Sequence, residues 1–464
     1  TMSKLCNYFS QHQFCVLVEY LGTNNIYPMA KNIAGFPTLA TFADRVHSDD
    51  DLAPLEAAAL YPKNVEKVLH FAGKNRDIKD FEKFLDQTQQ QGIQNLLLLT
   101  GDKLKLHENG IAKHERTRYL ESVNAIIQAK QKGGFCIGTA FNPFKYNEAE
   151  RDAQYFKLHK KLHAGADFII TQLGYDLDAL KQVIHFLSQH QYQQKVLACV
   201  MPLSLARAKY IVKHQVAGIV ITPHMLNVLE HEKQHGCTEN IYLRCAIQIL
   251  ICQHLGFAGI HLSACHKPEE QALLANYIDQ YRNLDLEACL KIWTELWEIK
   301  TGHEFIPALS NFSKPAQPTE ILKYHHLHFM HEVMFKSRVG FGAGRWIFQH
   351  SFWSKKLVSK VLLKTELLSK HSVLGCESCG QCRLGETLYI CPETCPKGLA
   401  NGPCGGTFLD RCEFGDRECI HSIKARLAKA VNQTEVLKNK LIPTVPIEVR
   451  GTSSWKNWYL ANEA

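Results

Sequence analysis

Eight short apolar runs recur between residues 14 and 264, and longer amphipathic stretches separate them. This alternation is typical of repeated βα units, in which a helix follows and covers each strand. The runs are CVLVEYL, PTLATFA, KVLHFAG, NLLLLTG, FCIGTAF, DFIITQL, VLACVMP and GIHLSA. Eight parallel strands covered by helices close into a barrel, so the predicted fold class is α/β, with a (β/α)8 TIM barrel. A ninth run, AGIVIT at 217–222, is either a short edge strand or the start of a helix.

Polar residues stand at the carboxyl ends of several predicted strands. They are Glu19, Thr41 with Asp44, His70, Asp102, Gln172 and Lys267. A single polar residue at a strand end is often only the N-cap of the following helix. The carboxyl ends of all barrel strands, however, lie on one face of the barrel. We therefore expect these side chains to line a pocket at the mouth of the barrel.

Cysteine supplies a second constraint, because eight of the seventeen cysteines fall within 44 residues. They are Cys376, Cys379, Cys382, Cys391, Cys395, Cys404, Cys412 and Cys419. The run C-x-x-C-x-x-C places three sulfurs close enough to face one centre, and thiolates that close require a cation or a disulfide. Metal is preferred here, because no signal peptide is evident and the other nine cysteines are scattered singly in apolar surroundings, as in a reduced cytoplasmic protein.

The identity of the metal stays open at this point. Four thiolates in tetrahedral geometry suit zinc, whereas the Cys-Pro pairs at 391–392 and 395–396 resemble the endings of ferredoxin ligand runs and suit a 4Fe–4S cluster. Eight sulfurs fill either one site, with four to spare, or two sites. His421 is a further candidate ligand, with a solvated helix position as the alternative.

Length and composition favour two domains. The chain has 464 residues, 45% of them hydrophobic, which suffices for a barrel of about 250 residues and a second unit. The run SNFSKPAQP interrupts the repeating pattern. We predict a barrel over 1–310, a basic helical region with the cysteine-rich module over 311–445, and a tail over 446–464. No apolar run reaches the roughly 18 residues of a membrane span, so we expect no membrane association.

The predicted connection between the two units is basic and aromatic. Residues 301–372 contain ten Lys and Arg against four Glu. Their aromatic residues include Phe341, Trp346, Phe348, Phe352 and Trp353. An interfacial helix and a nucleic-acid surface are the functional alternatives. We expect instead that the aromatic residues pack the units together while the lysines face water, and that the histidine-rich segment 325–331 is structural.

Five segments at the predicted strands carry a family resemblance: VEYLG, LHFAGKNRD, LLLLTGD, KLHAGADFIITQLGYD and GIHLSACHK. With them the chain resembles the methylenetetrahydrofolate reductases over nearly its whole length. The segment CESCGQCRLGETLYICPETCPKGLANGPCGGTFLDRCE is similar to a cysteine-rich module that is fused to, or paired with, such reductases in many bacteria. The resemblance implies a flavin-dependent oxidoreductase that converts 5,10-methylenetetrahydrofolate to 5-methyltetrahydrofolate in one-carbon metabolism and methionine biosynthesis.

The resemblance also implies roles for particular residues. Glu19 takes the place of the family's acid, which protonates folate N10 and opens the methylene bridge to an iminium. Asp102 takes the place of an aspartate near the flavin and the pterin. Gln172 and Lys267 fall at substrate-binding positions, although Ser263 and Lys267 stand where tyrosine and arginine are common. The implied cofactor-binding residues are Thr41, His70, Thr100, Gly101, Tyr119, Thr139, Phe141, Lys160 and Lys161. The two lysines match a pair that meets the flavin phosphates.

Several positions depart from the family pattern. Thr100 stands where arginine is usual, Phe141 where tyrosine is, and Gln154 where an acidic residue contacts the flavin ribityl chain. Ala206 stands where an aromatic residue stacks on the folate. The loss of one arginine–phosphate fork removes roughly 1.5–3 kcal/mol of charge-assisted bonding. Both FAD and FMN are therefore open as the flavin.

Two functions are compatible with these patterns. The first is the flavin enzyme, working in either direction with NADH or NADPH, or with an iron–sulfur electron donor; zinc would make the module structural. The second is a non-catalytic partner in the folate or corrinoid pathway, whose metal-stabilised module docks a redox or methyltransferase protein. We favour the enzyme, because the acid, the aspartate, the glutamine and the lysine pair occur together. A homo-oligomer is compatible with both functions.

A nucleic-acid-binding zinc protein is the third class considered. It would need a basic recognition helix and spaced pairs of ligands, and neither is present in the sequence. We therefore expect no nucleic-acid partner.

Overall fold

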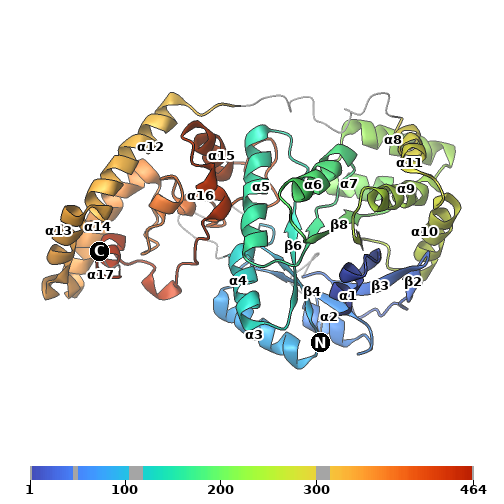
Figure 1. The fold of residues 1–464 in the computed structure, drawn as a ribbon, viewed down its shortest axis with the longest axis horizontal. Coiled ribbons are helices and arrows are strands. Elements are labelled where there is room, and N and C mark those ends of the chain that lie inside the picture. Colours follow the sequence, from blue (N-terminus) through green and yellow to red (C-terminus); the bar gives the residue numbers. More distant parts are fainter. Residues whose placement is uncertain (1–2, 45–50, 104–118, 299–313, 462–464) are drawn as a thin grey trace.

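The computed structural model describes residues 3–44, 51–103, 119–298 and 314–461. Eight parallel strands form a closed barrel in this structure (Figure 1). They are β1 (Cys15–Tyr20), β3 (Phe36–Phe42), β4 (Lys67–Ala72), β5 (Asn95–Leu99), β6 (Cys136–Phe141), β7 (Phe168–Thr171), β8 (Lys195–Val200) and β9 (Gly259–Leu262). Each strand pairs with the next, and β1 closes the barrel by pairing with both β3 and β9. The predicted (β/α)8 fold is confirmed, and all eight predicted runs are barrel strands.

The strands are nearly continuous apolar runs because they are buried on both faces, by the barrel interior and by the helices. The covering helices include α3 (Ile78–Gln90), α4 (Ser122–Lys132), α5 (Glu148–His163), α6 (Leu177–Gln189), α7 (Leu205–Lys213), α9 (Asn240–His254), α10 (Pro268–Tyr281) and α11 (Leu286–Leu296). Two short elements, α2 (Pro54–Ala59) and the antiparallel β2 (Asn32–Ile33), lie beside β3.

The ninth run, 217–222, is not a strand. It leads into α8 (Pro223–His235), and the Thr222 side chain caps that helix by accepting a hydrogen bond from the backbone N–H of Met225. Pro223 stands in the first turn, where its fixed φ suits a helix and its missing N–H costs nothing. The run is therefore a loop whose last residue caps the following helix, and the edge-strand alternative is wrong.

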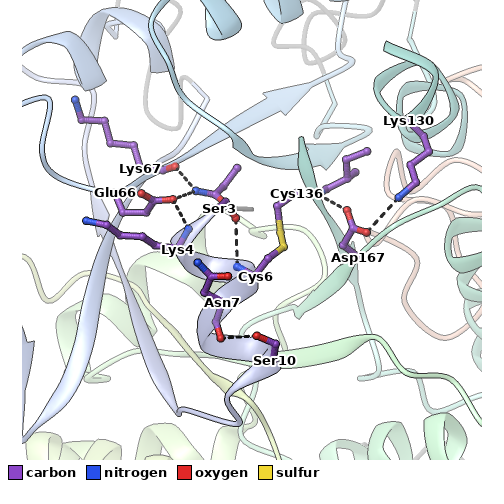
Figure 2. Close-up of a disulfide and its surroundings, with 12 residues drawn as sticks. Ser3, Lys4, Cys6, Asn7, Ser10, Glu66, Lys67, Lys130, Cys136 and Asp167 are labelled. Atoms are coloured by element: carbon purple, nitrogen blue, oxygen red, sulfur yellow. Dashed lines mark hydrogen bonds and ion pairs between the residues drawn. A yellow bond between two sulfur atoms is a disulfide. The ribbon is translucent and has the colours of Figure 1, made fainter. Parts of the chain in front are cut away.

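A disulfide links the N-terminal helix α1 (Lys4–Ser10) to the barrel. Cys6 bonds to Cys136, the first residue of β6, across 130 residues of sequence (Figure 2). The Phe9 ring of α1 lies 5.6 Å from the ring of Phe168, the first residue of β7, so α1 packs at the amino-terminal end of the barrel. The expectation that all nine scattered cysteines are single reduced thiols is wrong for this pair, because only barrel closure brings the two residues together.

The C-terminal region is helical around the cysteines. It contains α12 (Pro318–His331), a π-helical turn (Glu332–Lys336), α13 (Arg338–Gln349), α14 (Lys356–Leu374), α15 (Ile420–Ala430), α16 (Thr434–Asn439) and α17 (Ser454–Ala461), with short 3-10 turns between them. In Figure 1, α15 and α16 lie against α5 of the barrel, whereas α13, α14 and α17 form the far end of the molecule. Among the described helices, none combines the length and the apolar composition needed to cross a bilayer.

The aromatic residues of this region do not behave as one group. Phe341 and Phe348 pack on Tyr459 of α17, at ring distances of 5.8 and 5.6 Å. Trp346 and Phe352 are instead 68% and 52% exposed. The expectation that the aromatic residues pack the barrel onto the second unit is therefore not met. The boundary predicted near 310 lies outside the described residues.

The histidine-rich segment is part of a second, small core in α12. His328 stacks on Tyr324, and its Nδ1 lies 3.0 Å from the Tyr389 hydroxyl. Leu427 and Ala428 of α15 belong to the same cluster. These contacts account for His328 as a packing residue, as expected from the sequence.

Candidate functional site

A partly buried group of four polar side chains lies where β1, β8 and β9 meet. Glu19, on β1, accepts a hydrogen bond of 3.4 Å from the Ser263 hydroxyl, directly after β9. Nε2 of His261, on β9, lies 3.8 Å from the other carboxylate oxygen of Glu19. The Cys199 thiol, on β8, lies 3.6 Å from Nδ1 of the same histidine. The parallel register that closes the barrel therefore places these side chains together.

The surroundings of Glu19 keep a proton on it near neutral pH. Burial raises the pKa of this carboxyl to about 7, against the opposing hydrogen bond from Ser263. Burial also lowers the pKa of His261 to about 4, so the imidazole is neutral. A carboxylic acid with this pKa beside a neutral histidine is suited to donate a proton at physiological pH.

Thr41 and His70 lie next to this group. Thr41 is the register partner of Glu19 on the adjacent strand β3. Its hydroxyl lies 2.6 Å from Nε2 of His70 on β4, and both side chains are buried. The His70 ring lies 5.7 Å from the His261 ring, and burial holds the pKa of His70 well below its usual value. Glu19, Thr41 and His70 are therefore brought together as predicted, whereas Asp44 is bonded to Arg76 and to the Ala72 backbone.

The end of β5 meets the cysteine-rich segment. Tyr119 donates a hydrogen bond of 2.9 Å to the carbonyl oxygen of Asp102. Nζ of Lys397 donates 2.7 Å to the Gly101 carbonyl oxygen and lies 5.4 Å from the centre of the Tyr119 ring. Thr100 is buried against Ser122. Four residues predicted to bind the cofactor or to act in catalysis thus lie together at the end of β5. Lys397, from the C-terminal region, contacts two of them, Gly101 and Tyr119.

The inner face of α5 is also covered by this segment. Gln154 donates 2.7 Å to the Cys404 carbonyl oxygen, and Lys157 donates to the carbonyl oxygens of Gly402 and Pro403. Lys161 donates 2.5 Å to the Ala140 carbonyl oxygen of β6. Lys160 is 1% exposed, and burial lowers its pKa to about 7.

The remaining predicted residues are spread around the barrel. Gln172 lies at the end of β7 and donates 3.3 Å to the Ala217 carbonyl oxygen. Phe141 packs its ring 4.9 Å from Tyr155 of α5, toward the helical layer. Thr139 on β6 is fully buried, and its hydroxyl has no hydrogen-bond partner among the described residues. Lys267 is exposed at the start of α10.

The eight clustered cysteines form two groups of four. Cys376, Cys379, Cys382 and Cys391 line one cavity of about 20 Å³. The second group is close enough together that the charge of each thiolate would raise the pKa of Cys412; its other members are Cys395, Cys404 and Cys419. All eight are free thiols. Within the described ranges, however, no three His, Cys, Asp or Glu side chains are arranged tightly enough to hold a metal ion as they stand.

His421, the further candidate ligand, is buried rather than solvated, and its Nε2 has no hydrogen-bond partner among the described residues.

Several residues of the site were not predicted from the sequence. His261 is the one with a detectable signal, because a histidine interrupts the apolar strand GIHL. Lys397 and Glu413 form a buried ion pair of 2.6 Å, and Glu413 accepts from the backbone N–H of Lys103 at 2.9 Å. Glu413 also accepts from the Cys404 thiol at 3.4 Å. The contact between Lys103 and Glu413 joins residues 310 positions apart in the chain, so nothing in the local sequence indicates it.

Two family models match the chain. The model described as methylenetetrahydrofolate reductase matches residues 38–276, and the model described as methylene-tetrahydrofolate reductase C terminal matches residues 356–447. The chain belongs to the methylenetetrahydrofolate reductase family. Glu19 precedes the first match, whereas the other barrel residues of the site lie within it. All eight clustered cysteines lie within the second match.

Curated relatives agree with this family assignment. Methylenetetrahydrofolate reductase 2 of Saccharomyces cerevisiae is 28% identical over 192 residues, which are 40% of this chain and 30% of the yeast protein. Methylenetetrahydrofolate reductase (NADH) 1 of Arabidopsis thaliana is 28% identical over 152 residues, 30% of this chain and 25% of the plant protein. The probable methylenetetrahydrofolate reductase (NADPH) of Caenorhabditis elegans is 27% identical over 193 residues, 40% and 27% of the two chains. The match thus spans less than a third of each relative's length.

A flavin fits the residues of the barrel mouth better than those of α5. Thr41, His70 and the unpartnered hydroxyl of Thr139 are buried polar groups on three strands, which suits a cofactor ring with polar edges. On α5, Gln154, Lys157 and Lys161 are bonded to backbone carbonyl oxygens. A flavin phosphate at these lysines must therefore replace bonds that the folded chain already makes.

Proposed function

We propose that this protein is a flavin-dependent enzyme that interconverts 5,10-methylenetetrahydrofolate and 5-methyltetrahydrofolate. The observation that carries the proposal is the carboxyl of Glu19, a side chain only 19% exposed, whose pKa burial raises to about 7 beside Ser263 and His261. A proton donor is what the opening of the methylene bridge requires, since N10 becomes a better leaving group when it is protonated. The family match over residues 38–276 supports the same chemistry through the rest of the barrel mouth, since Glu19 itself precedes the matched residues.

In this proposal each barrel residue has a limited task. Glu19 holds the proton and donates it toward folate N10, and Ser263 fixes the orientation of its carboxyl group. His261 stays neutral because burial lowers its pKa. A protonated histidine at this place would lower the pKa of Glu19, so the neutral imidazole leaves the acid protonated. Gln172 offers an amide to the pterin ring, while Thr41, His70 and Thr139 would hold the flavin. The bound flavin would supply the hydride, and NADH or NADPH would reduce it.

The cysteine groups are proposed to hold metal, as 4Fe–4S clusters or as zinc. In the first group, the four thiols line a single cavity. In the second group, Cys404 bonds to Glu413, which pairs with Lys397, whose Nζ bonds to the Gly101 carbonyl oxygen at the end of β5. This chain of contacts supports an electron route between a cluster and the barrel mouth, whereas zinc in the same place would only fasten the segment to the barrel.

The contacts on α5 favour a second candidate function. If the C-terminal segment stays on Gln154 and Lys157, a dinucleotide flavin has no free phosphate site on this helix. The chain would then be a non-catalytic partner in the folate or corrinoid pathway, with the metal module docking a redox or methyltransferase protein. The two candidates differ in whether the barrel takes up flavin.

The test is the visible spectrum of anaerobically purified protein, with iron, zinc and flavin analysis on one sample. Flavin bands, with or without about four irons per cluster, support the enzyme. A protein that stays without flavin after incubation with FAD and with FMN contradicts the enzyme and supports the partner function. Cys382→Ser and Cys412→Ser, one in each group, should each remove about half of the metal if there are two centres. Complete loss in either variant contradicts two independent centres.

A further inference from the structure

The far end of the molecule presents apolar side chains to solvent. On α13, Val339 and Trp346 are 83% and 68% exposed, and on α14, Leu357, Val361 and Leu368 are 76%, 57% and 81% exposed. We call these five residues the α13–α14 surface. Positions 357, 361 and 368 fall on one stripe of a helix, as do 339 and 346. Single exposed apolar residues are common, but stripes of them on two successive helices at one end of the molecule indicate a binding surface.

The exposed stripes lie on helices whose opposite faces are packed. Phe341 of α13 is buried against Tyr459, and a Cβ at Gly344 would lie 2.3 Å from the same ring. On α14, Glu366 is buried and accepts hydrogen bonds from Ser453 and Ser454. The helices therefore cannot turn their apolar stripes inward without losing these contacts.

The charge around this surface has one sign. From residue 333 to residue 365 the sequence has seven Lys or Arg and no Asp or Glu. Lys364 continues the apolar stripe of α14, and Lys356 and Lys360 flank it, all three exposed. Long lysine side chains can lay their methylenes along an apolar surface while the ammonium group reaches an anion.

We propose that the α13–α14 surface binds the surface of a membrane that contains anionic lipids. Helices that lie in the membrane interface combine an apolar stripe with flanking Lys or Arg and a tryptophan, which is the pattern found here. A second copy of the chain is a poorer occupant, because it would bring seven cations against seven. The surface lies at the end of the molecule away from the barrel, so a flat membrane can approach it without meeting the barrel (Figure 1). Binding of this kind needs no spanning segment, because an interfacial helix lies in the plane of the membrane and does not cross it.

The test is co-sedimentation of the full chain with vesicles of phosphatidylcholine containing about 30% phosphatidylserine, against vesicles of phosphatidylcholine alone. We expect at least about tenfold stronger binding to the anionic vesicles, weakened by salt. Leu357→Ser with Leu368→Ser should lower the binding about tenfold or more. Ile26→Ser with Tyr210→Ser is the matched control, since these residues are 57% and 53% exposed outside the C-terminal region. Circular dichroism verifies the fold of each variant.

Further variants separate charge from apolar contact. Replacing Lys356, Lys360 and Lys364 by Gln should weaken binding and flatten its salt dependence. Trp346→Phe should remove a blue shift of tryptophan fluorescence that anionic vesicles cause. The proposal is overturned if the wild type does not prefer anionic vesicles, or if the double serine variant binds them as well as the control does. Binding to polyglutamate without binding to vesicles also overturns it, in favour of an acidic protein partner, as does a dimer without vesicle binding that the serine variant abolishes.

Discussion

Asn142, directly after β6, donates a hydrogen bond of 2.7 Å to the carbonyl oxygen of Gly405, 263 residues further along the chain. The same amide donates 3.0 Å to the Gly218 carbonyl oxygen. Lys145 adds a bond of 2.9 Å to Gly405 and a second bond to Thr407. The cysteine-rich segment is therefore part of the wall around the carboxyl ends of β6 and β7, where Gln172 lies.

Replacing Glu19 by Gln should separate the two half-reactions. The amide keeps the size of the side chain but cannot donate an acidic proton, so folate turnover should fall about 10²- to 10⁴-fold. Reduction of the flavin by NADH or NADPH should stay within about twofold of the wild type. Stopped-flow absorbance measures both steps. Equal loss of both half-reactions contradicts the role of Glu19 as the acid.

The wild-type folate step should also slow as pH rises. Burial raises the pKa of Glu19 to about 7 in the folded chain, so its protonated fraction falls above that pH. A rate for the folate half-reaction that is level from pH 6 to pH 9 contradicts this assignment.

The same pKa gives a stability prediction of defined sign. Because the folded-state pKa of Glu19 lies above its ordinary value of 4.5, the contribution of the protonated group is full below about pH 4.5 and is lost as pH rises through about 7. Glu19→Gln has no such dependence. The free energy of unfolding of the wild type should therefore drop relative to the variant between pH 5 and pH 8, by up to about 3 kcal/mol. Urea unfolding at both pH values measures it, and a constant difference between the two proteins contradicts the prediction.

Gly218→Ala should loosen the cysteine-rich segment from the barrel. Gly218 has φ +76, and a Cβ there would lie 2.6 Å from the Gly405 carbonyl oxygen and from Nδ2 of Asn142. Gly236→Ala is the matched control, with φ +71 and no atom within 4 Å of the added Cβ. The control should cost about 1–2 kcal/mol of backbone strain, and Gly218→Ala about 1–3 kcal/mol more.

Urea unfolding measures these costs, and limited proteolysis measures the opening of the segment. Only Gly218→Ala should speed cleavage within residues 397–412. Equal behaviour of the two variants would show that the contact with Gly405 contributes nothing.

Cys6→Ser should lower stability through the lost disulfide. The Cys6–Cys136 bond closes a loop of 130 residues, and a bond of this kind typically contributes about 2–5 kcal/mol. Cys237→Ser replaces a free, half-exposed cysteine and should have almost no effect. Thermal unfolding with and without a thiol reductant compares the three proteins. The reductant should lower the Tm of the wild type to that of Cys6→Ser. If the wild type does not respond, the two thiols are not bonded in solution.

The sequence alone was enough for the barrel and for much of its mouth. Alternating apolar runs and amphipathic stretches predict all eight barrel strands, because each strand is local and is buried on both faces. The sequence also predicted that Glu19, Thr41 and His70 lie together, because the carboxyl ends of parallel barrel strands share one face. The structure places them on adjacent strands, with Thr41 bonded to His70. The clustering of the cysteines was likewise plain from their spacing.

Other features depended on contacts that no local pattern encodes. Cys6 pairs with Cys136 only because barrel closure places the start of β6 next to α1. His261 faces Glu19 only because β9 pairs with β1. Lys161 matches a flavin-contacting lysine of the family and Gln154 replaces an acidic flavin contact. In the folded chain they bond to the Ala140 and Cys404 carbonyl oxygens.

Sequence by itself thus determined which residues form the barrel strands and the cysteine cluster, because these depend on periodicity and spacing over a few residues. The tertiary structure decided which side chains lie inside the mouth, which bonds the α5 lysines make and which stripes of α13 and α14 stay exposed. The reason is physical. Burial and hydrogen-bond partners depend on segments hundreds of residues apart, and they set both the pKa of Glu19 and the exposure of Trp346 and Leu368.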